Sequence, residues 1–376
     1  MTAEGDSAGP MRLALELARQ ALGTTSPNPA VGAVVVKEGR VVGEGYTHPP
    51  GGPHAEVVAL RQAGDAARGS VLYVTLEPCC HEGRTGACTK AIIDAGVREV
   101  RFSHIDPDPN VSGRGKRALE EAGIAVHVGE GEEEARRINE AYIKHRTTGL
   151  PFVIAKFAVS LDGKIAATSG DSRWVSSAES REWAHRQRTQ IDAIIVGVRT
   201  VLADDPELTA RPGGSAEGAR QPLRIIADSR GRTPESARAL SGPAKTLIVT
   251  TRRSRASWRK AMAAKGAEVL VVPSYRGKTD LPALLRELGR RQLLSLLVEG
   301  GGGLLGGFFD IGLVDKVQAI IAPMIIGGER SPTAVAGRGA RRMADALRLR
   351  DVAVERLGDD LLVTGYVGEQ SPPQEM

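Results

Sequence analysis

Apolar positions along the chain alternate between helical and strand-like spacing, and this alternation is the main indication of the fold. Residues 11–22 carry apolar side chains three to four positions apart, which predicts a helix that ends at Gly23. Strand-like runs follow at residues 33–36 and 40–43, and the KEG sequence between them predicts a hairpin. Helices and strands continue to alternate as far as residue 128. The first part of the chain is therefore predicted to form an α/β domain with a largely covered sheet.

A charged helical stretch at residues 130–146 leads to the sequence TTGLP, and a new strand is expected at residues 152–157. We place the domain boundary there, with one domain at residues 1–146 and a second at residues 151–368. The second half again alternates strands with helices, and its further strands are expected at residues 193–196, 224–227, 246–249, 268–272, 294–298 and 316–321. No repeat of fixed period is visible, which excludes a solenoid.

The two halves differ in charge. The 376 residues are 41% hydrophobic and 25% charged, which excludes disorder, collagen and coiled coil as the dominant state. Residues 1–150 hold 17 basic and 20 acidic side chains, whereas residues 151–376 hold 33 and 25, so the net charges are −3 and +8. A basic half predicts anionic partners, and an aromatic content of 3% offers little for stacking single-stranded nucleic acid. Small phosphorylated molecules are the expected partners, with no nucleic acid.

The three cysteines lie within residues 79–88, an odd number in a chain too long to need a disulfide framework. The N-terminal sequence lacks the pattern of a secretory signal, and no apolar run approaches the length of a membrane span. We expect a cytoplasmic protein with reduced thiols and no membrane contact.

The most specific chemical signal is the HAE sequence that begins at His54, followed by Cys79 in a Pro-Cys step and then by Cys88. Hydrolytic zinc sites use three protein ligands and leave one position open for water, while a carboxylate that does not bind the metal moves protons. His54, Cys79 and Cys88 supply three ligands, and Glu56 supplies the carboxylate. The order matches the zinc-deaminase signature H-x-E then P-C-x-x-C, except that the cysteines here are nine residues apart.

Other readings of this segment stay open. Cys80 could replace Cys79 as a ligand, although its place after the Pro-Cys step favours an ordinary thiol. His81 could be a fourth ligand, which would close the site and leave Glu56 with no water to activate. A structural zinc site is the remaining alternative.

A glycine run in the second half, Gly300 to Gly303, lies between a predicted strand and a helical stretch. Backbone N–H groups there can approach a pyrophosphate at the helix N-terminus, although four glycines can also form a flexible turn. Polar residues also follow two predicted strands, where α/β sheets usually bind ligands: Lys156, Ser160, Asp162, Thr200, Asp204, Asp205 and Arg211. Capping and turn formation explain these polar residues equally well.

Motifs in both halves resemble one known family. The first half carries PNPAVGAVVV, GEGYTHPPGGPHAEVVAL, YVTLEPCCHEGRTGAC and DPDPNVSGRG. The second half carries SLDGKIA, GDSRWVSS, GVRTVLADDPELTAR, ADSRGR, VEGGG and IAPMIIGG. Together they resemble the bifunctional deaminase/reductase of riboflavin biosynthesis, in the family's order over nearly all of residues 11–366. The longer gap between the cysteines is normal for that family, although Gly86 and Ala87 replace its usual two prolines.

The resemblance implies an α/β chain with an N-terminal cytidine-deaminase-like zinc domain. The implied reaction is hydrolytic deamination of 2,5-diamino-6-(5-phosphoribosylamino)pyrimidin-4(3H)-one to 5-amino-6-(5-phosphoribosylamino)uracil. Glu56 would take a proton from the zinc-bound water and deliver it to the leaving ammonia. By position, the side chains that would line the substrate pocket are Asn28, His48, His81 and Arg84.

For the second half the resemblance implies a dihydrofolate-reductase-like domain that uses NADPH to reduce the ribosyl group to ribityl. Residues implied to contact NADPH are Ala158, Trp174, Thr200, Asp204, Ser229, Gly301, Gly302, Gly303, Leu304, Leu305, Gly306 and Gly307. Residues implied to contact the substrate are Ser172, Arg188, Leu208, Arg211 and Glu299, with the two arginines suited to its phosphate. Lys156 and Glu299 are the charged groups expected to assist opening of the ribose ring. A homo-oligomer, dimer or tetramer, is expected.

Two alternative functions each require features that can be checked in the sequence. A nucleic-acid editing protein would need basic clusters interleaved with aromatic residues, and the only dense basic cluster is RRSR at residues 252–255. A zinc deaminase joined to a degenerate binding module would lack the VEGGG or the LADDP motif, and both are present. The bifunctional enzyme is therefore our leading hypothesis.

Overall fold

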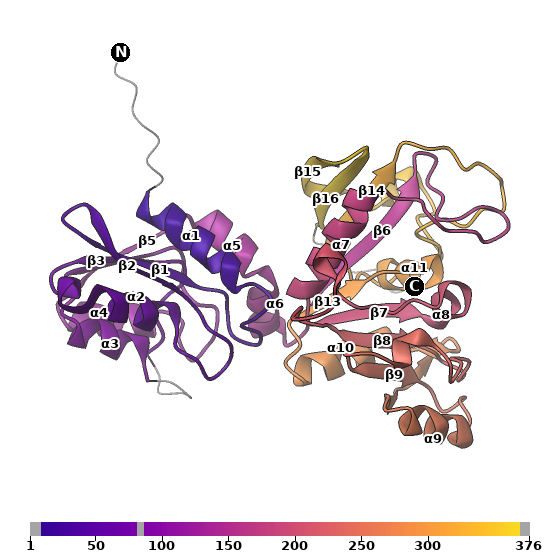
Figure 1. Cartoon of the computed structure of the whole chain (residues 1–376), viewed down its shortest axis with the longest axis horizontal. Helices are drawn as coiled ribbons and strands as arrows, with labels where there is room; N and C mark the ends of the chain where they lie inside the picture. The colour runs from indigo at the N-terminus through magenta and orange to yellow at the C-terminus, as the bar shows by residue number, and fades with distance from the viewer. Residues whose placement is uncertain (1–8, 81–85, 369–376) are drawn as a thin grey trace, which may run out of the picture. The chain divides into compact units, whose positions relative to one another are not determined.

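The computed structural model describes residues 9–80 and 86–368, and the chain forms two compact units, Met1–Gly149 and Leu150–Met376. The division falls within the TTGLP segment, between Gly149 and Leu150. Each unit has its own sheet with its own helices (Figure 1). None of the helices in the described parts of the chain is long and apolar enough to cross a bilayer.

The first unit is built on a five-stranded sheet with the order β2-β1-β3-β4-β5. Its strands are β1 (Gly32–Lys37), β2 (Arg40–Tyr46), β3 (Val71–Val74), β4 (Glu99–Phe102) and β5 (Ala125–Val128). The predicted hairpin is confirmed, since β1 pairs antiparallel with β2. β3, β4 and β5 run parallel to one another, as expected for strands joined through helices.

The helices of this unit are α1 (Pro10–Ala21), α2 (Ala55–Ala63), α3 (Cys88–Asp94), α4 (Arg114–Glu121), α5 (Glu132–Ile138) and α6 (Glu140–Thr148), with a 3-10 turn η1 (Gly64–Ala67). The apolar face of α1 packs close to β1: a Cβ atom on Gly32 would lie 1.9 Å from the carbonyl oxygen of Ala14. Only glycine allows this approach.

The single helical stretch expected at residues 130–146 is instead two helices, α5 and α6, which meet at Asn139. The buried side chain of Asn139 accepts a hydrogen bond from the backbone N–H of Ala30 and donates one to its carbonyl, both at 2.9 Å. These two hydrogen bonds fix Asn139, the residue between α5 and α6, to the segment that precedes β1. They also direct α6 along the site described below.

The second unit is built on a nine-stranded sheet with the order β10-β9-β8-β7-β13-β6-β14-β16-β15. Its strands are β6 (Phe152–Ser160), β7 (Ala193–Gly197), β8 (Leu223–Ala227), β9 (Thr246–Thr250), β10 (Glu268–Val271), β13 (Ser295–Val298), β14 (Lys316–Ala322), β15 (Leu349–Leu357) and β16 (Asp360–Val367). The strands from β10 to β14 in the sheet are parallel, whereas β16 and β15 are antiparallel. A separate two-stranded ribbon is formed by β11 (Ser274–Tyr275) and β12 (Lys278–Thr279).

The helices of this unit are α7 (Ala178–Gln190), α8 (Val198–Asp204), α9 (Ala256–Ala264), α10 (Leu281–Arg290) and α11 (Gly302–Phe309), with 3-10 turns η2 (Pro212–Gly214), η3 (Arg238–Leu240) and η4 (Met343–Asp345). The central strands are apolar along their length. Their side chains pack with those of α10 and α11 to form one hydrophobic core. Because these strands are parallel, their carboxyl ends lie at one edge of the sheet, where α8 and α11 begin (Figure 1).

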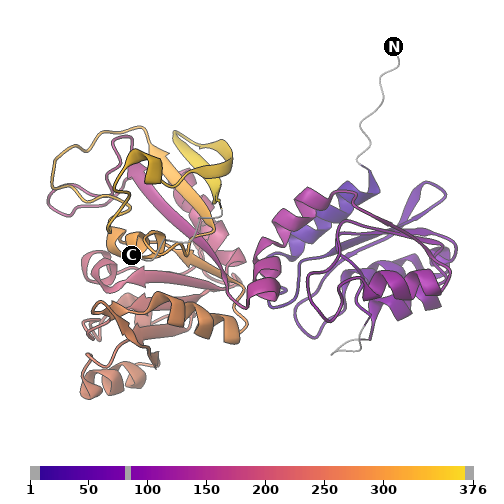
Figure 2. The same cartoon turned by 180° about the vertical axis from the view of Figure 1, so that it is seen from behind.

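Two long connections also lie at this edge. The segment after β6 and the segment after β14 are joined by the bridge between Lys164 and Thr333 and by hydrogen bonds such as Ile165 N–H to the Pro332 carbonyl, 2.9 Å (Figure 2). The two connections therefore brace each other beside the end of β6.

Candidate active sites

In the first unit, three metal-ligating side chains come together from three separate segments. His54 precedes α2, Cys79 follows β3 and Cys88 is the first residue of α3. The His54 Nδ1 atom lies 3.2 Å from Cys88 Sγ and 3.6 Å from Cys79 Sγ, and the potential ligand atoms all lie within 4.8 Å of one another. The Cys80 sulfur is not part of this group and lies 4.0 Å from the Asn110 carbonyl.

Electrostatics favour negative charge at this cluster. A hydrogen bond with the Cys88 thiol lowers the pKa of Cys79 to about 4, and the same bond raises the pKa of Cys88. A hydrogen bond with Cys79 raises the pKa of His54. One imidazole nitrogen and two sulfurs are a donor set that suits zinc, and three ligands leave a fourth position for water.

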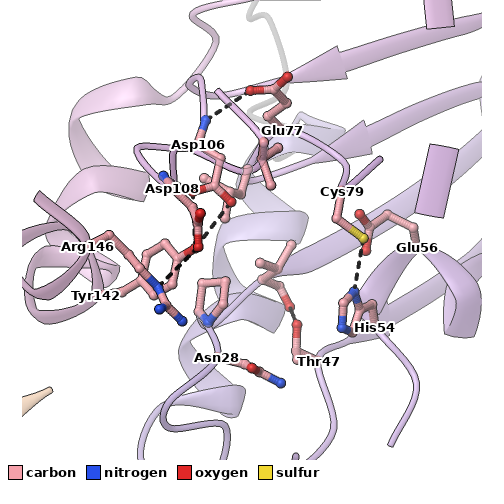
Figure 3. A pocket seen from close by; sticks show the side chains of 14 residues that line it. Asn28, Thr47, His54, Glu56, Glu77, Cys79, Asp106, Asp108, Tyr142 and Arg146 are labelled. Atoms are coloured by element: carbon pink, nitrogen blue, oxygen red, sulfur yellow. Dashed lines mark hydrogen bonds and ion pairs between the residues drawn. The ribbon is translucent and has the colours of Figure 1, made fainter. Parts of the chain in front are cut away.

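Glu56 lies in the first turn of α2 and points toward the same cluster (Figure 3). Its side chain is buried, and burial, together with the charge of Cys79, raises the pKa of Glu56 to about 7. The HAE spacing thus puts a ligand at the helix N-cap and a carboxylate in the first turn, as the sequence predicted.

A pocket of about 120 Å³ opens beside this cluster (Figure 3). It is lined by Asn28, Pro29, Val31, Thr47, His54, Glu56, Leu76, Glu77, Cys79, Asp106, Asp108, Val111, Tyr142 and Arg146. Asn28 therefore lies where its predicted role requires. His48 is not among these residues and packs near the Tyr46 ring, and His81 and Arg84 lie outside the described residues.

Sequence reasoning missed the wall of the pocket opposite the cluster. Tyr142 Oη donates to the carboxylate of Asp106 at 3.1 Å, and Arg146 Nε lies 3.5 Å from Asp108 Oδ2. Burial raises the pKa of Asp106 to about 6 and also raises that of Tyr142. The available signals were the DPDPN sequence and the four-residue spacing of Tyr142 and Arg146 on α6.

Glu77 connects this wall to the cysteine segment. Its buried carboxylate accepts hydrogen bonds from the backbone N–H groups of Asp106 (3.1 Å), Gly113 (2.9 Å) and Lys116 (3.0 Å). Two of these donors belong to the N-terminus of α4, which has no side-chain cap of its own. Glu77 thus caps a helix from a distant segment.

In the second unit, Lys156, Arg188 and Glu299 form a charged cluster. Arg188 donates two hydrogen bonds to the Glu299 carboxylate, at 2.9 and 2.6 Å, and a third to the Thr209 carbonyl at 2.9 Å. Burial alone would raise the pKa of Glu299, but the charges of Arg188 and Lys156 lower it to about 2. Burial lowers the pKa of Lys156 against the opposing effect of Glu299.

The glycine-rich turn, residues 300–303, directly follows Glu299 at the carboxyl end of β13. The Gly301 N–H donates to the Thr200 hydroxyl at 3.0 Å, and Gly302 begins α11. A Cβ on Gly302 would lie 2.4 Å from the Thr333 carbonyl, and one on Gly306 would lie 1.7 Å from the Ala336 carbonyl. The glycines are therefore needed for close packing, and the open N-terminus of α11 offers backbone donors for an anion.

The remaining residues expected in the reductase site are placed as follows. Ser172 donates to the Asp204 carboxylate at 2.9 Å, the Arg211 guanidinium pairs with Glu207, and Ser229 follows β8. Ala158 is on β6, Leu208 is buried, and Trp174 is 67% exposed under the Arg181 guanidinium. Both arginines expected to hold the substrate phosphate are thus already paired with acidic side chains.

The comparisons with known proteins cover both units. Residues 7–104 match the model of the cytidine and deoxycytidylate deaminase zinc-binding region, and residues 151–363 match that of the RibD C-terminal domain. The chain is similar to the riboflavin biosynthesis protein RibD of Aquifex aeolicus, with 43% identity over 94% of this chain and 96% of that protein. It is 39% identical to the Escherichia coli protein of the same name, over 93% of this chain and 96% of that one.

Solved structures agree over the same length. Acinetobacter baumannii RibD has 37% identity and a TM-score of 0.86, covering 96% of this chain and 98% of that one. A diaminohydroxyphosphoribosylaminopyrimidine deaminase/5-amino-6-(5-phosphoribosylamino)uracil reductase from Thermotoga maritima has 34% identity and a TM-score of 0.84, with the same coverage. Since these similarities extend across both units, the chain belongs to the RibD family of bifunctional riboflavin biosynthesis enzymes, with a zinc-binding deaminase region followed by a reductase domain.

Proposed function

We propose that residues 1–146 hydrolyse 2,5-diamino-6-(5-phosphoribosylamino)pyrimidin-4(3H)-one to 5-amino-6-(5-phosphoribosylamino)uracil and ammonia, and that residues 151–368 reduce that product with NADPH. The deaminase assignment is carried by one observation, which is that His54, Cys79 and Cys88 converge beside a pocket that also holds the Glu56 carboxylate. The substrates are those named for the Thermotoga relative.

In the deaminase site, His54, Cys79 and Cys88 would hold one zinc ion per chain. Zinc, when bound, supplies the activation of water for attack on the ring carbon that carries the amino group. Glu56 accepts the proton that this water loses and delivers it to the departing amine, so that water and substrate become uracil and ammonia. Asn28, which also lines the pocket, orients the pyrimidine ring.

In the reductase site, NADPH would supply a hydride to C1′ of the substrate. The bond between C1′ and the ring oxygen breaks while the proton of the C1′-linked nitrogen passes to that oxygen, which gives a hydroxyl and an imine, and the hydride would then add to C1′. The nitrogen gains the last proton, which gives the ribityl amine. Lys156 lies in the middle of β6, beside Glu299, which directly follows β13, and there the two side chains can move these protons.

The N-terminus of α11 and the Thr200 hydroxyl would hold the pyrophosphate of the cofactor. Ser172 donates to Asp204, the last residue of α8, and Ala158 lies on β6. Trp174 is exposed, under the Arg181 guanidinium. In this proposal both sites act on small molecules in the cytoplasm. The chain is expected to form a dimer or tetramer, which light scattering can measure.

One experiment tests both activities together. The chain is incubated with the diaminopyrimidinone substrate and NADPH while ammonia and the absorbance of NADPH are followed. Ammonia release with NADPH oxidation is expected. Ammonia without oxidation, with fresh cofactor, would contradict the reductase assignment, and oxidation only after the uracil is added separately would contradict the deaminase assignment.

A further inference from the structure

One buried polar side chain in the sheet of the second unit lacks a hydrogen-bond partner for its oxygen. Gln318 lies on β14 and is 6% exposed, and its Oε1 atom has no partner among the described residues. A buried amide oxygen that has lost its contact with water destabilises the fold unless another group pairs with it. Valine or isoleucine would suit an interior strand better. The presence of glutamine at this position therefore needs an explanation other than stability.

The register of the sheet places Gln318 beside the charged cluster of the reductase site. β6 lies between β13 and β14 (Figure 1). Gln318 is paired directly with Lys156 across β14 and β6. On the other side of β6, Val298 is paired with Ala155, so that Glu299 comes next to Lys156. Glu299, Lys156 and Gln318 thus form one row across three strands, and neighbouring strands are about 4.8 Å apart.

The row points away from the hydrophobic core that contains α10 and α11. Successive side chains of a strand point to opposite faces of the sheet, so Lys156 and Gln318 lie on the face opposite to their neighbours in the chain. Arg188 reaches Glu299 from α7, and the charges of both act on Lys156, which puts the pair on the same face as Lys156 and Gln318. The chain neighbours of Lys156 and Gln318 that pack in the core are Ala155, Phe157, Val317 and Ala319.

The chemistry proposed for this site indicates which group can pair with the amide. Lys156 and Glu299 move protons at the ring oxygen and the nitrogen that are attached to C1′ of the substrate. The carbon next to C1′ carries the 2′-hydroxyl, so this hydroxyl lies beside the reacting atoms. A hydroxyl both donates and accepts a hydrogen bond, and it can therefore pair with either the oxygen or the nitrogen of an amide.

We propose that Gln318 binds the 2′-hydroxyl of the substrate and makes the reductase select a ribosyl compound over a 2′-deoxyribosyl compound. This inference rests on the proposed reduction at C1′. The substrate supplies the partner that the folded chain does not provide for Oε1. A residue that costs stability in this way is typical of a binding site.

A substrate without the 2′-hydroxyl provides the first test. The kcat/KM of NADPH oxidation is measured with 5-amino-6-(5-phosphoribosylamino)uracil and with its 2′-deoxy analogue. The wild-type chain should prefer the ribosyl compound, because the analogue leaves the buried amide unpaired. Methionine resembles glutamine in length and is at most a weak acceptor, so Gln318→Met should reduce this preference roughly tenfold, through a higher KM for the ribosyl compound. The different intrinsic reactivities of the two compounds cancel when the preferences of the two chains are compared.

Stability provides the second test, because a structural role and a binding role predict opposite results. Replacing an unpaired buried amide with an apolar side chain of similar shape is neutral or stabilising. The thermal unfolding midpoint of Gln318→Met, followed by circular dichroism, should therefore equal or exceed that of the wild-type chain. An amide that is paired within the fold would give a lower midpoint.

The matched control is Thr364→Val, which removes a polar group from the next position of the same row. Thr364 is paired with Gln318 on β16, one strand farther from Lys156. Valine keeps the shape of threonine without its hydroxyl. The preference for the ribosyl compound should be the same in Thr364→Val as in the wild-type chain.

The outcomes separate this inference from the proposed function. A wild-type chain that reduces both compounds equally well overturns the assignment, as does a Gln318→Met chain that keeps the full preference or unfolds at a lower temperature. An equal loss of preference in Thr364→Val also overturns it, because the effect would then come from the sheet and not from the amide. A wild-type chain that oxidises NADPH with neither compound contradicts the proposed reduction itself.

Discussion

At the scale of single residues, the proposed role of Glu56 allows metal binding and proton transfer to be tested separately. Its carboxylate lies in the pocket but is not among the three grouped ligands. The Glu56→Gln variant should therefore retain about one zinc per chain while ammonia release falls by roughly 10²-fold to 10⁴-fold, the usual effect of losing a general acid/base. Zinc is measured by atomic absorption and ammonia by a coupled assay.

The matched control removes ligands instead of the carboxylate. The double variant Cys79→Ala, Cys88→Ala should lose zinc and ammonia release together while the reductase remains active. Zinc retained in this double variant, or full deaminase activity in Glu56→Gln, would contradict the assigned roles.

Asp106 gives the first unit a predictable dependence on pH. Its pKa is raised from 3.8 to about 6 by burial, with Tyr142, Asp108 and Glu77 as the ionisable groups around it. A carboxyl group with a raised pKa in the folded state stabilises the fold fully below pH 4, and this contribution is lost as the pH rises through 6. Relative to Asp106→Asn, the wild-type unit should lose up to about 3 kcal/mol between pH 4 and pH 7.

Hydrogen exchange of amides in residues 97–149, corrected for intrinsic rates, measures this difference at pH 4.5 and pH 7.5. Asp94→Asn, which changes an exposed carboxylate on α3, is the control. Parallel pH profiles for wild type and Asp106→Asn would show that Asp106 titrates alike in the folded and unfolded chain.

At the scale of elements, Glu77 couples the loop of Asp106 and Asp108 to the N-terminus of α4. Its carboxylate accepts three backbone N–H groups, and the amide of glutamine can replace only one of its two oxygens. Glu77→Gln should weaken the anchoring by about 1.5–3 kcal/mol and raise KM for deamination more than it lowers kcat. Faster hydrogen exchange confined to residues 105–117 is the accompanying signature.

Glu120→Gln is the control for this prediction, because Glu120 lies exposed on α4, where its carboxylate is 3.7 Å from Lys116 Nζ. If Glu77→Gln lost zinc and had a lower kcat with unchanged KM, the prediction would be contradicted, because Glu77 would then act on the metal site and not on the loop. Unchanged exchange in the loop would show that the three hydrogen bonds do not hold it.

The elements also show what the sequence can and cannot predict. The parallel strands β6, β7, β8, β9 and β13 are buried on both faces, so they form apolar runs that were predicted correctly. β15 was missed because it is an edge strand whose nine residues are almost all exposed and carry charges between the apolar positions.

The same distinction applies to the sites. His54, Glu56 and Cys79 are recognisable because zinc chemistry needs fixed residue types at short spacing. Tyr142 and Arg146 were not predicted, because their spacing on α6 does not reveal that this helix packs against a loop more than thirty residues earlier in the chain. Asn139, which breaks the predicted long helix and directs α6, acts through a hydrogen bond to Ala30 that no local pattern reveals.

At the scale of the whole molecule, the two sites share no residue within residues 9–80 and 86–368. In these ranges, the residues that line the deaminase pocket lie between Asn28 and Arg146, and the charged cluster and glycine turn of the reductase lie between Lys156 and Gly306. Each unit also has its own sheet and core. A point substitution should therefore abolish one activity and leave the other. Two chains that each lack a different activity should together carry out both reactions.

An equal mixture of Glu56→Gln chains and chains with Lys156→Met tests this. If the proposed roles hold, Glu56→Gln chains form the uracil very slowly and Lys156→Met chains do not reduce it, so neither alone should oxidise NADPH at an appreciable rate when given the diaminopyrimidinone substrate. Because each unit is complete in itself, the mixture should oxidise NADPH after a lag in which the uracil accumulates in solution. The lag should shorten as the concentration of Lys156→Met chains rises. A mixture that releases ammonia but never oxidises NADPH would mean that the uracil must pass between sites within one assembly. The two units would then depend on each other, although each has its own sheet, core and site.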